Sequence, residues 1–110
     1  MLIYTPEPEA LRAVLRDVFG WEFVEDHPGW LIFKMPPAEI GVHPSSGATT
    51  HQICLMCDDI HATVDDLRTK GVETRDEPAE ESFGITVTIV LPGGVEVLLY
   101  EPTHASPLDL

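Results

Sequence analysis

The sequence predicts an α+β protein in which one βαβββ unit is followed by a second unit of the same element order. Two observations lead to this prediction. Each half contains one stretch with apolar residues at the helical period, and these stretches end at Gly20 and at Gly71. Short apolar segments bounded by Pro and Gly surround both stretches, as is typical of strands. Residue identity between the halves is negligible, so the repeat is one of organisation.

The first half opens with a short apolar segment, residues 1–5, that we expect to form a strand ending before Pro6. The helix that follows has its apolar residues on one stripe: Leu11, Val14, Leu15, Val18 and Phe19. Three further strands are expected after Gly20, over residues 21–25, 30–35 and 38–43, with a turn at 26–29.

The second half repeats this order with a strand over residues 52–57 and a helix that Asp58 or Asp59 can cap. The apolar positions of this helix are Ile60, Val64 and Leu67. We expect an acidic loop over residues 76–82 and strands over residues 72–75, 85–91 and 95–101. A single domain results, with module one at residues 1–44, a linker at 45–50, module two at 51–102 and a tail at 103–110.

The strands have two unlike faces. Val87, Ile89 and Leu91 share one side of their strand and are purely aliphatic, so this side should meet a helix. The opposite sides carry mixed residues, which suits the lining of a cavity enclosed by a curved mixed sheet, with one helix of each half on the convex face. By the same parity the cavity-facing residues are Glu39, Gly41, His43, Gln52, Cys54, Met56, Glu96, Leu98 and Tyr100.

Composition excludes several classes of function. The formal net charge is −13, and such a surface repels both nucleic-acid phosphates and anionic membranes. It serves solubility or steers a cationic ligand. The chain opens without a basic leader and has no apolar run of the roughly 20 residues that cross a bilayer. With only two cysteines, we expect a cytoplasmic protein that binds neither nucleic acid nor membrane.

Particular segments carry a resemblance to a known family. They are LRDVFGWEF at residues 15–23, GWLIF at 29–33, AEIGVHP at 38–44, CDDIHATVDDLRTKGVE at 57–73 and LPGGVEVLLYEP at 91–102. In this order they resemble the glyoxalase/bleomycin-resistance/extradiol dioxygenase, or vicinal oxygen chelate, superfamily. The last two segments are the most specific, because their pairing is typical of that superfamily.

The resemblance implies a metal centre built from four strand positions, two in each half. The first position falls before Met1, the second is Glu39, the third is Gln52, and the fourth is Leu98, whose side chain cannot bind a metal. Because a catalytic ion needs three or more protein ligands, we predict an incomplete metal site and no resident cofactor. A divalent metal is the alternative, held by Glu39 and Gln52 together with His43, His51 or Glu96. Strand parity places His51 on the helix side unless the register slips by one residue.

The catalytic residues are not assigned, and the candidates are Glu39, Glu96 and His43. If Glu39 and Glu96 share one cavity, the two carboxylates raise each other's pKa and supply a general base, or they bind a cationic ligand. The third alternative is that one or both lie at a solvated rim. His43 is a base, a ligand or a plain strand-end residue. Cys54 and Cys57 fall on opposite faces of a strand, which argues against a redox pair. The predicted ligand-binding residues are Trp30, Glu39, His43, Gln52, Cys54, Glu96, Leu98 and Tyr100.

Three functions remain open at this point. The favoured one is a binding protein of the bleomycin-resistance kind, which holds a small cationic or aromatic molecule without a metal and pairs its modules in a homodimer. The alternative is a divalent-metal-dependent lyase, isomerase or dioxygenase of the same superfamily. A third is a scaffold that uses the fold only to dimerise.

Overall fold

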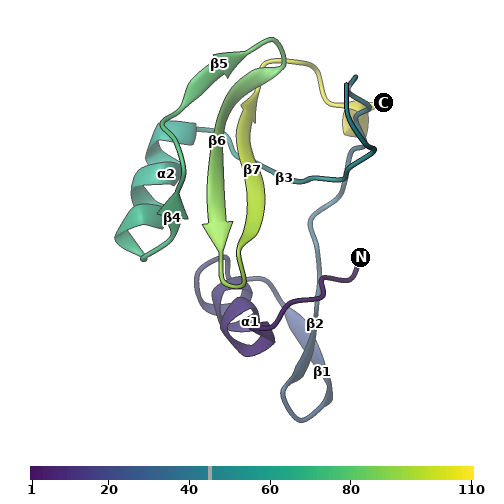
Figure 1. Ribbon diagram of the computed structural model, residues 1–110, viewed down its shortest axis with the longest axis vertical. Coiled ribbons are helices and arrows are strands. Elements are labelled where there is room, and N and C mark those ends of the chain that lie inside the picture. Colours follow the sequence, from purple (N-terminus) through teal and green to yellow (C-terminus); the bar gives the residue numbers. More distant parts are fainter. Residues whose placement is uncertain (45) are drawn as a thin grey trace.

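The computed structural model describes residues 1–44 and 46–110, and its two helices and two separate sheets confirm the predicted α+β class (Figure 1). Serine 45, in the predicted linker, lies outside the described residues. The elements in chain order are α1 (Pro8–Asp17), β1 (Phe23–His27), β2 (Trp30–Phe33), β3 (Ile53–Met56), α2 (Ile60–Thr69), β4 (Glu73–Thr74), β5 (Ala79–Glu81), β6 (Gly84–Leu91), β7 (Val95–Pro102) and the short 3-10 helix η1 (Pro107–Asp109).

The larger sheet has the strand order β3-β7-β6-β4, and β5 also pairs with β6. Its long strands β6 and β7 are antiparallel over their whole length, with Gly84 opposite Pro102 and Leu91 opposite Val95. Strand β3 runs parallel to β7, with Ile53 opposite Val97. The predicted acidic loop is therefore partly a strand, because β5 pairs antiparallel with β6.

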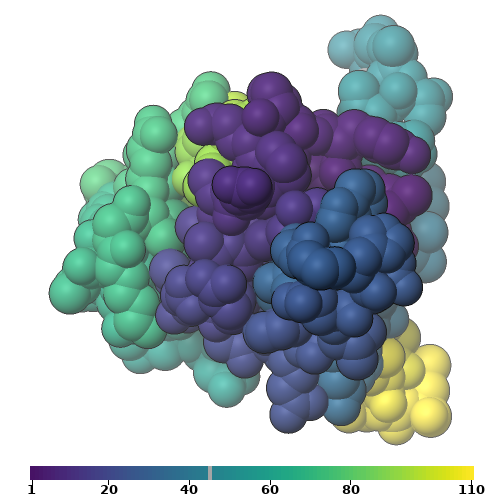
Figure 2. Space-filling view, turned by 90° about the horizontal axis from the view of Figure 1, so that it is seen from below, coloured from purple at the N-terminus to yellow at the C-terminus, as the bar shows by residue number. Residues whose placement is uncertain are grey.

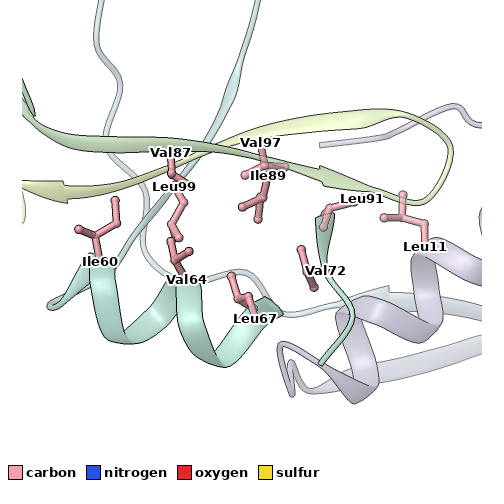
Figure 3. Packing of buried hydrophobic residues seen from close by; sticks show 10 residues of the cluster. All are labelled: Leu11, Ile60, Val64, Leu67, Val72, Val87, Ile89, Leu91, Val97 and Leu99. Carbon is pink, nitrogen blue, oxygen red and sulfur yellow. The ribbon is translucent and has the colours of Figure 1, made fainter. Parts of the chain in front are cut away.

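The hydrophobic core lies between this sheet and α2 (Figure 3). Val87 and Ile89 of β6 are fully buried, as the alternation of the sequence predicts. They face Ile60 and Val64 of α2. Leu11 of α1 reaches the end of the same core beside Val72 and Leu91, and it is 5% exposed. Helix α1 of module one thus contributes to the core of module two.

Both ends of α2 are set by local hydrogen bonds. The Asp59 carboxylate accepts from the Ala62 amide at 3.1 Å, which is the predicted N-cap. At the other end Gly71 has φ +85°, and the Val72 amide donates to the Leu67 carbonyl at 2.9 Å. This pairing closes the helix as a glycine-terminated C-cap does, because only glycine adopts that backbone angle without strain.

The N-terminal residues are joined to the turn between β6 and β7. The Gly93 amide donates to a carboxylate oxygen of Glu7 at 2.7 Å. Gly93 has φ +85°, and a Cβ at this position would collide with the Thr5 side chain. Both the backbone angle and this close approach require glycine here.

Module one is less complete than predicted. Its sheet consists of β1 and β2 alone, paired antiparallel with Phe23 opposite Phe33. The predicted strands over residues 1–5 and 38–43 are wrong, because neither segment is a strand in the structure. A strand forms only where a neighbouring strand takes up its backbone N–H and C=O groups. The side chains of Ile40 and Val42 are 95% and 97% exposed, so segment 38–43 is apolar but unpacked.

Helix α1 contacts the β1–β2 ribbon through Arg12, whose guanidinium lies 5.2 Å from the Trp30 ring centroid, while its Leu11 packs into the core of module two. In the view from the α1 end, the N-terminal residues and the β1–β2 hairpin cover this end of the molecule, with the C-terminal tail visible beyond them (Figure 2). No helix among residues 1–44 and 46–110 is long and apolar enough to cross a membrane.

Candidate functional site

The face of the larger sheet opposite α2 carries most of the residues predicted to line a cavity. Directly paired residues project to the same side, so the register Cys54–Leu98–Thr88 and Met56–Tyr100–Thr86 forms two rows on this face. We call it the open face, and its residues are Cys54, Met56, Thr86, Thr88, Val90, Glu96, Leu98 and Tyr100. Met56 is 43% exposed and Cys54 is exposed, so this face meets solvent along β3.

Tyr100 is the exception, because it is only 9% exposed although it lies on the open face. The Phe83 ring contacts it edge-on with centroids 5.8 Å apart, and the His104 ring lies at 6.2 Å. Burial raises the pKa of the Tyr100 phenol, and the neighbouring Glu39 carboxylate and Cys54 thiol raise it further. Glu39 and Cys54 thus lie near enough to the Tyr100 phenol for their charges to act on its pKa.

Glu39 is held by the C-terminal tail. The Ser106 hydroxyl donates to Glu39 Oε2 at 2.6 Å, and the Ser106 oxygen in turn accepts from the Leu108 amide at 3.1 Å. Glu39 is half-buried there, whereas its neighbours Ala38 and Ile40 are exposed. The tail therefore folds back over the Tyr100 end of the sheet and covers the carboxylate.

Glu96 lies on the same face but has a different partner. Arg75 donates to its carboxylate at 2.7 Å. The Arg75 amide bonds to the Thr88 carbonyl, which continues the β4–β6 ladder and puts the arginine on the open face. Both side chains are about half exposed, so we expect this ion pair to contribute no more than about 1 kcal/mol. Glu39 and Glu96 therefore each have their own hydrogen-bond donor.

The remaining predicted residues are more scattered. Leu98 is half-buried on the open face, while Gln52 and His51 are exposed just before β3. His43 is also exposed, and its Nδ1 donates to the Pro44 carbonyl at 2.7 Å, since a carbonyl oxygen only accepts. Trp30 is at the β1–β2 hairpin, at the other end of the long axis from the tail (Figure 1).

The Trp30 ring already has two partners. The Arg12 guanidinium lies 5.2 Å from its centroid, and the His27 ring lies 5.5 Å away. The indole is still 59% exposed. It forms an aromatic surface of its own, apart from the Tyr100 end of the open face.

The donor set of the described residues does not fit the metal centre that the resemblance implied. Nowhere in residues 1–44 and 46–110 do three His, Cys, Asp or Glu side chains gather closely enough to hold an ion. Glu39 is bonded to Ser106, and the fourth implied position is the aliphatic Leu98. Three or more protein ligands are the usual requirement of a catalytic ion.

Four residues of this region were missed by sequence reasoning: Phe83, Arg75, His104 and Ser106. A partial signal existed for the last, because a serine directly before Pro107 is typical of an N-cap with proline at the first helical position. No local pattern predicts that the capping serine would also reach Glu39, which lies 67 residues away in sequence.

A separate cavity of about 410 Å³ lies between α1, the end of α2 and the β6–β7 turn. Val14, Val18, Val72 and Leu91 supply its apolar walls, and Lys70 lies at its margin. None of the residues predicted for the site lines it.

The comparisons with known proteins agree with this fold. The family model of the Glyoxalase/Bleomycin resistance protein/Dioxygenase superfamily matches residues 1–103. The chain belongs to this superfamily. No curated protein matches the chain significantly.

Solved structures of superfamily proteins share the fold. TnmS3, an antibiotic binding protein from Streptomyces sp. CB03234, is 21% identical with a TM-score of 0.68, covering 92% of this chain and 91% of that one. Lactoylglutathione lyase from Agrobacterium tumefaciens is 21% identical with a TM-score of 0.64, covering 90% and 88%. A superfamily member from Sphaerobacter thermophilus is 20% identical with a TM-score of 0.60, covering 91% of each chain. These likenesses confirm the glyoxalase-like fold, and the family model confirms the resemblance.

Proposed function

We propose that this superfamily member is a binding protein that holds a small organic molecule on the open face, without a resident metal. The observation that carries the proposal is that the half-buried Glu39 carboxylate lies at the same end of that face as the paired Tyr100 and Phe83 rings. Aromatic rings offer a stacking platform, and a carboxylate beside them selects a cation or a hydrogen-bond donor.

The charge of the chain supports a cationic aromatic ligand. A net charge of −13 raises the local concentration of cations and speeds their encounter with the surface. TnmS3 is described as an antibiotic binding protein, which supports small-molecule binding by this fold. The fold alone does not choose, because the similar lactoylglutathione lyase is named for a catalytic activity.

The proposal includes a homodimer that covers the apolar residues of module one. Fully burying an aliphatic side chain stabilises by about 1.5–3 kcal/mol, and Ile40 and Val42 forgo nearly all of this in the single chain. Val24 and Ile32 of the β1–β2 ribbon are 65% and 60% exposed. A second copy that pairs with segment 38–43 would take up both its side chains and its backbone groups. We place this dimer in the cytoplasm, where the free thiols of Cys54 and Cys57 stay reduced.

The binding proposal is tested by titrating the protein with 9-aminoacridine, a planar aromatic cation, and following its fluorescence anisotropy. We expect saturable binding that Glu39→Gln weakens about tenfold, through loss of a charged hydrogen-bond acceptor. Glu80→Gln removes the same charge from the exposed strand β5 and should leave binding unchanged. Anilinonaphthalene sulfonate, an aromatic anion, should bind far more weakly. Equal binding of both dyes, unaffected by Glu39→Gln, would contradict the proposal.

A metal measurement separates this function from the divalent-metal enzyme. The protein is purified without chelator or affinity tag, and its metal content is measured with that of Glu39→Ala. One ion per chain that disappears in the variant would favour a lyase, isomerase or dioxygenase over a binding protein.

A further inference from the structure

The C-terminal tail, residues 103–110, already occupies the place where the proposed ligand would bind. It leaves β7 with the Thr103 amide bonded to the Phe83 carbonyl at 3.0 Å. It then puts the His104 ring beside Tyr100 and the Ser106 hydroxyl on Glu39. One ring and one hydrogen-bond donor of the tail thus meet the ring and the acceptor of the site.

The tail is attached by few apolar contacts. Leu108 is 52% exposed and Leu110 is fully exposed, so neither leucine anchors it. Its 3-10 helix is held by local bonds, from Asp109 to the Ser106 carbonyl and from Leu110 to the Pro107 carbonyl, both 3.2 Å. A segment with this little buried apolar surface opens at low free-energy cost.

We propose that the tail is an internal competitor of the ligand, which must displace Ser106 from Glu39 and His104 from Tyr100 in order to bind. This inference rests on the proposed function and adds to it the class of ligand: a planar ring that carries a hydroxyl, ammonium or amidinium donor. The ring takes the position of the His104 imidazole, and the donor takes that of the Ser106 hydroxyl.

Competition makes a prediction opposite to that of a lid. If the tail were a lid over the ligand, removing the bond that holds it closed would weaken ligand binding by the protein. If the tail is a competitor, removing that bond strengthens ligand binding by the protein. Loosening the tail also exposes Tyr100 to water, which should bring its raised pKa back towards the ordinary value of a phenol.

The test uses the full chain and 9-aminoacridine. The variant is Ser106→Ala, which removes the hydrogen bond from Ser106 to Glu39, here called the latch. Ser46→Ala, an exposed serine ahead of β3, is the matched control. We expect Ser106→Ala to bind the dye about fivefold more tightly and Ser46→Ala to bind as the unaltered protein does. Deuterium exchange of the Ser106, Leu108, Asp109 and Leu110 amides should rise when the unaltered protein is saturated with dye.

Weaker binding by Ser106→Ala, or slower amide exchange of the tail in the complex, would overturn the proposal that the tail competes with the ligand. Either result would show that the tail acts as a lid. Binding that neither variant changes, with unaltered tail exchange, would equally overturn it and leave the proposed function intact. If neither the unaltered protein nor Ser106→Ala binds the dye, the proposed function fails.

The contact between the tail and Tyr100 is then tested without a ligand, by titrating the phenol in a Tyr4→Phe background, whose single phenol is Tyr100. A titration midpoint that Ser106→Ala does not lower would overturn the latch as well.

Discussion

Module two buries one face of its long strands β6 and β7, whereas module one leaves most of its strand residues in water, although the sequence predicts the same element order for both. In module two, β6 and β7 pair through eight consecutive positions, and Val87, Ile89 and Val97 are at most 1% exposed. In module one, β1 and β2 form a ribbon of five and four residues. All five residues of β1 are exposed.

The difference shows that alternating apolar residues specify a strand only where a neighbouring strand is present. Two strands alone are marginal in water, and three or more with a covered face are needed for independent stability. Helix α1 is stabilised in another way, because its Leu11 packs into the core of module two. In β2 only Leu31 and Phe33 are half-buried, and all of β1 is exposed, which is why the proposed dimer matters for this half.

The largest expected effect comes from the same substitution made in each module. Ile89→Ala should lower the free energy of unfolding by about 2–5 kcal/mol, because it leaves a cavity in a fully buried site. Ile40→Ala removes a side chain that is 95% exposed and should cost less than about 0.5 kcal/mol in the monomer. Urea unfolding at low protein concentration measures both.

Raising the protein concentration sharpens this comparison. If a second copy covers segment 38–43, Ile40→Ala should lower the concentration-dependent part of the stability and shift the mass in solution towards the monomer. An Ile40→Ala variant as unstable as Ile89→Ala at every concentration would show that module one is packed within its own chain.

The second effect concerns the helix that connects the two modules. Leu11→Ala should destabilise by about 2–3 kcal/mol, since Leu11 is 5% exposed and lies beside Leu91 and Val72 in the shared core. Leu2→Ala is the control, because Leu2 is 80% exposed. Thermal unfolding followed by circular dichroism reports both. Equal melting temperatures for the two variants would mean that α1 is not docked on module two.

Much of module two was predictable because its signals are local and consistent with one another. The stripe Ile60–Val64–Leu67, the cap at Asp59 and the stop at Gly71 all predict one helix, and the structure confirms each. The strict alternation of β6 predicted its buried face correctly. Local signals of this kind succeed where the neighbouring elements are also present.

The errors in module one have a different origin. Residues 38–43 alternate as a strand does, but pairing is a long-range property that the segment does not encode. The open-face positions of Cys54, Glu96 and Tyr100 followed from parity alone. The Ser106–Glu39 and Arg75–Glu96 contacts depend on how distant segments dock, and for this reason the sequence did not reveal them.

A smaller effect is expected where module one meets the β6–β7 turn. Glu7→Gln should cost about 1 kcal/mol, because an amide oxygen is a weaker acceptor than a carboxylate for the Gly93 N–H. Glu9→Gln, in the first turn of α1, is the matched change and should cost less, about 0.3 kcal/mol. Urea unfolding of the two variants gives the difference. A larger loss in Glu9→Gln would contradict the contact.

The smallest effect is the pH dependence that Tyr100 adds to module two. Its pKa is raised in the folded protein by burial, and then by Glu39 and Cys54. A raised folded-state pKa favours the protonated form, so the stabilisation is complete below the ordinary phenol pKa of about 10 and is lost as pH rises through the folded value. In a Tyr4→Phe background, the ultraviolet titration of the single remaining phenol should have its midpoint above the ordinary value.

The same background tests the linkage to stability. The urea midpoint should fall between neutral pH and the alkaline range, and Tyr4→Phe/Tyr100→Phe should lose the part of that fall that belongs to Tyr100. Lysine deprotonation and general charge repulsion act on both proteins alike and cancel in the comparison. An identical alkaline fall in the two proteins would mean that the phenol is as solvated when folded as when unfolded. The tail could then not be covering Tyr100, and module two would end in an exposed ring much like those of module one.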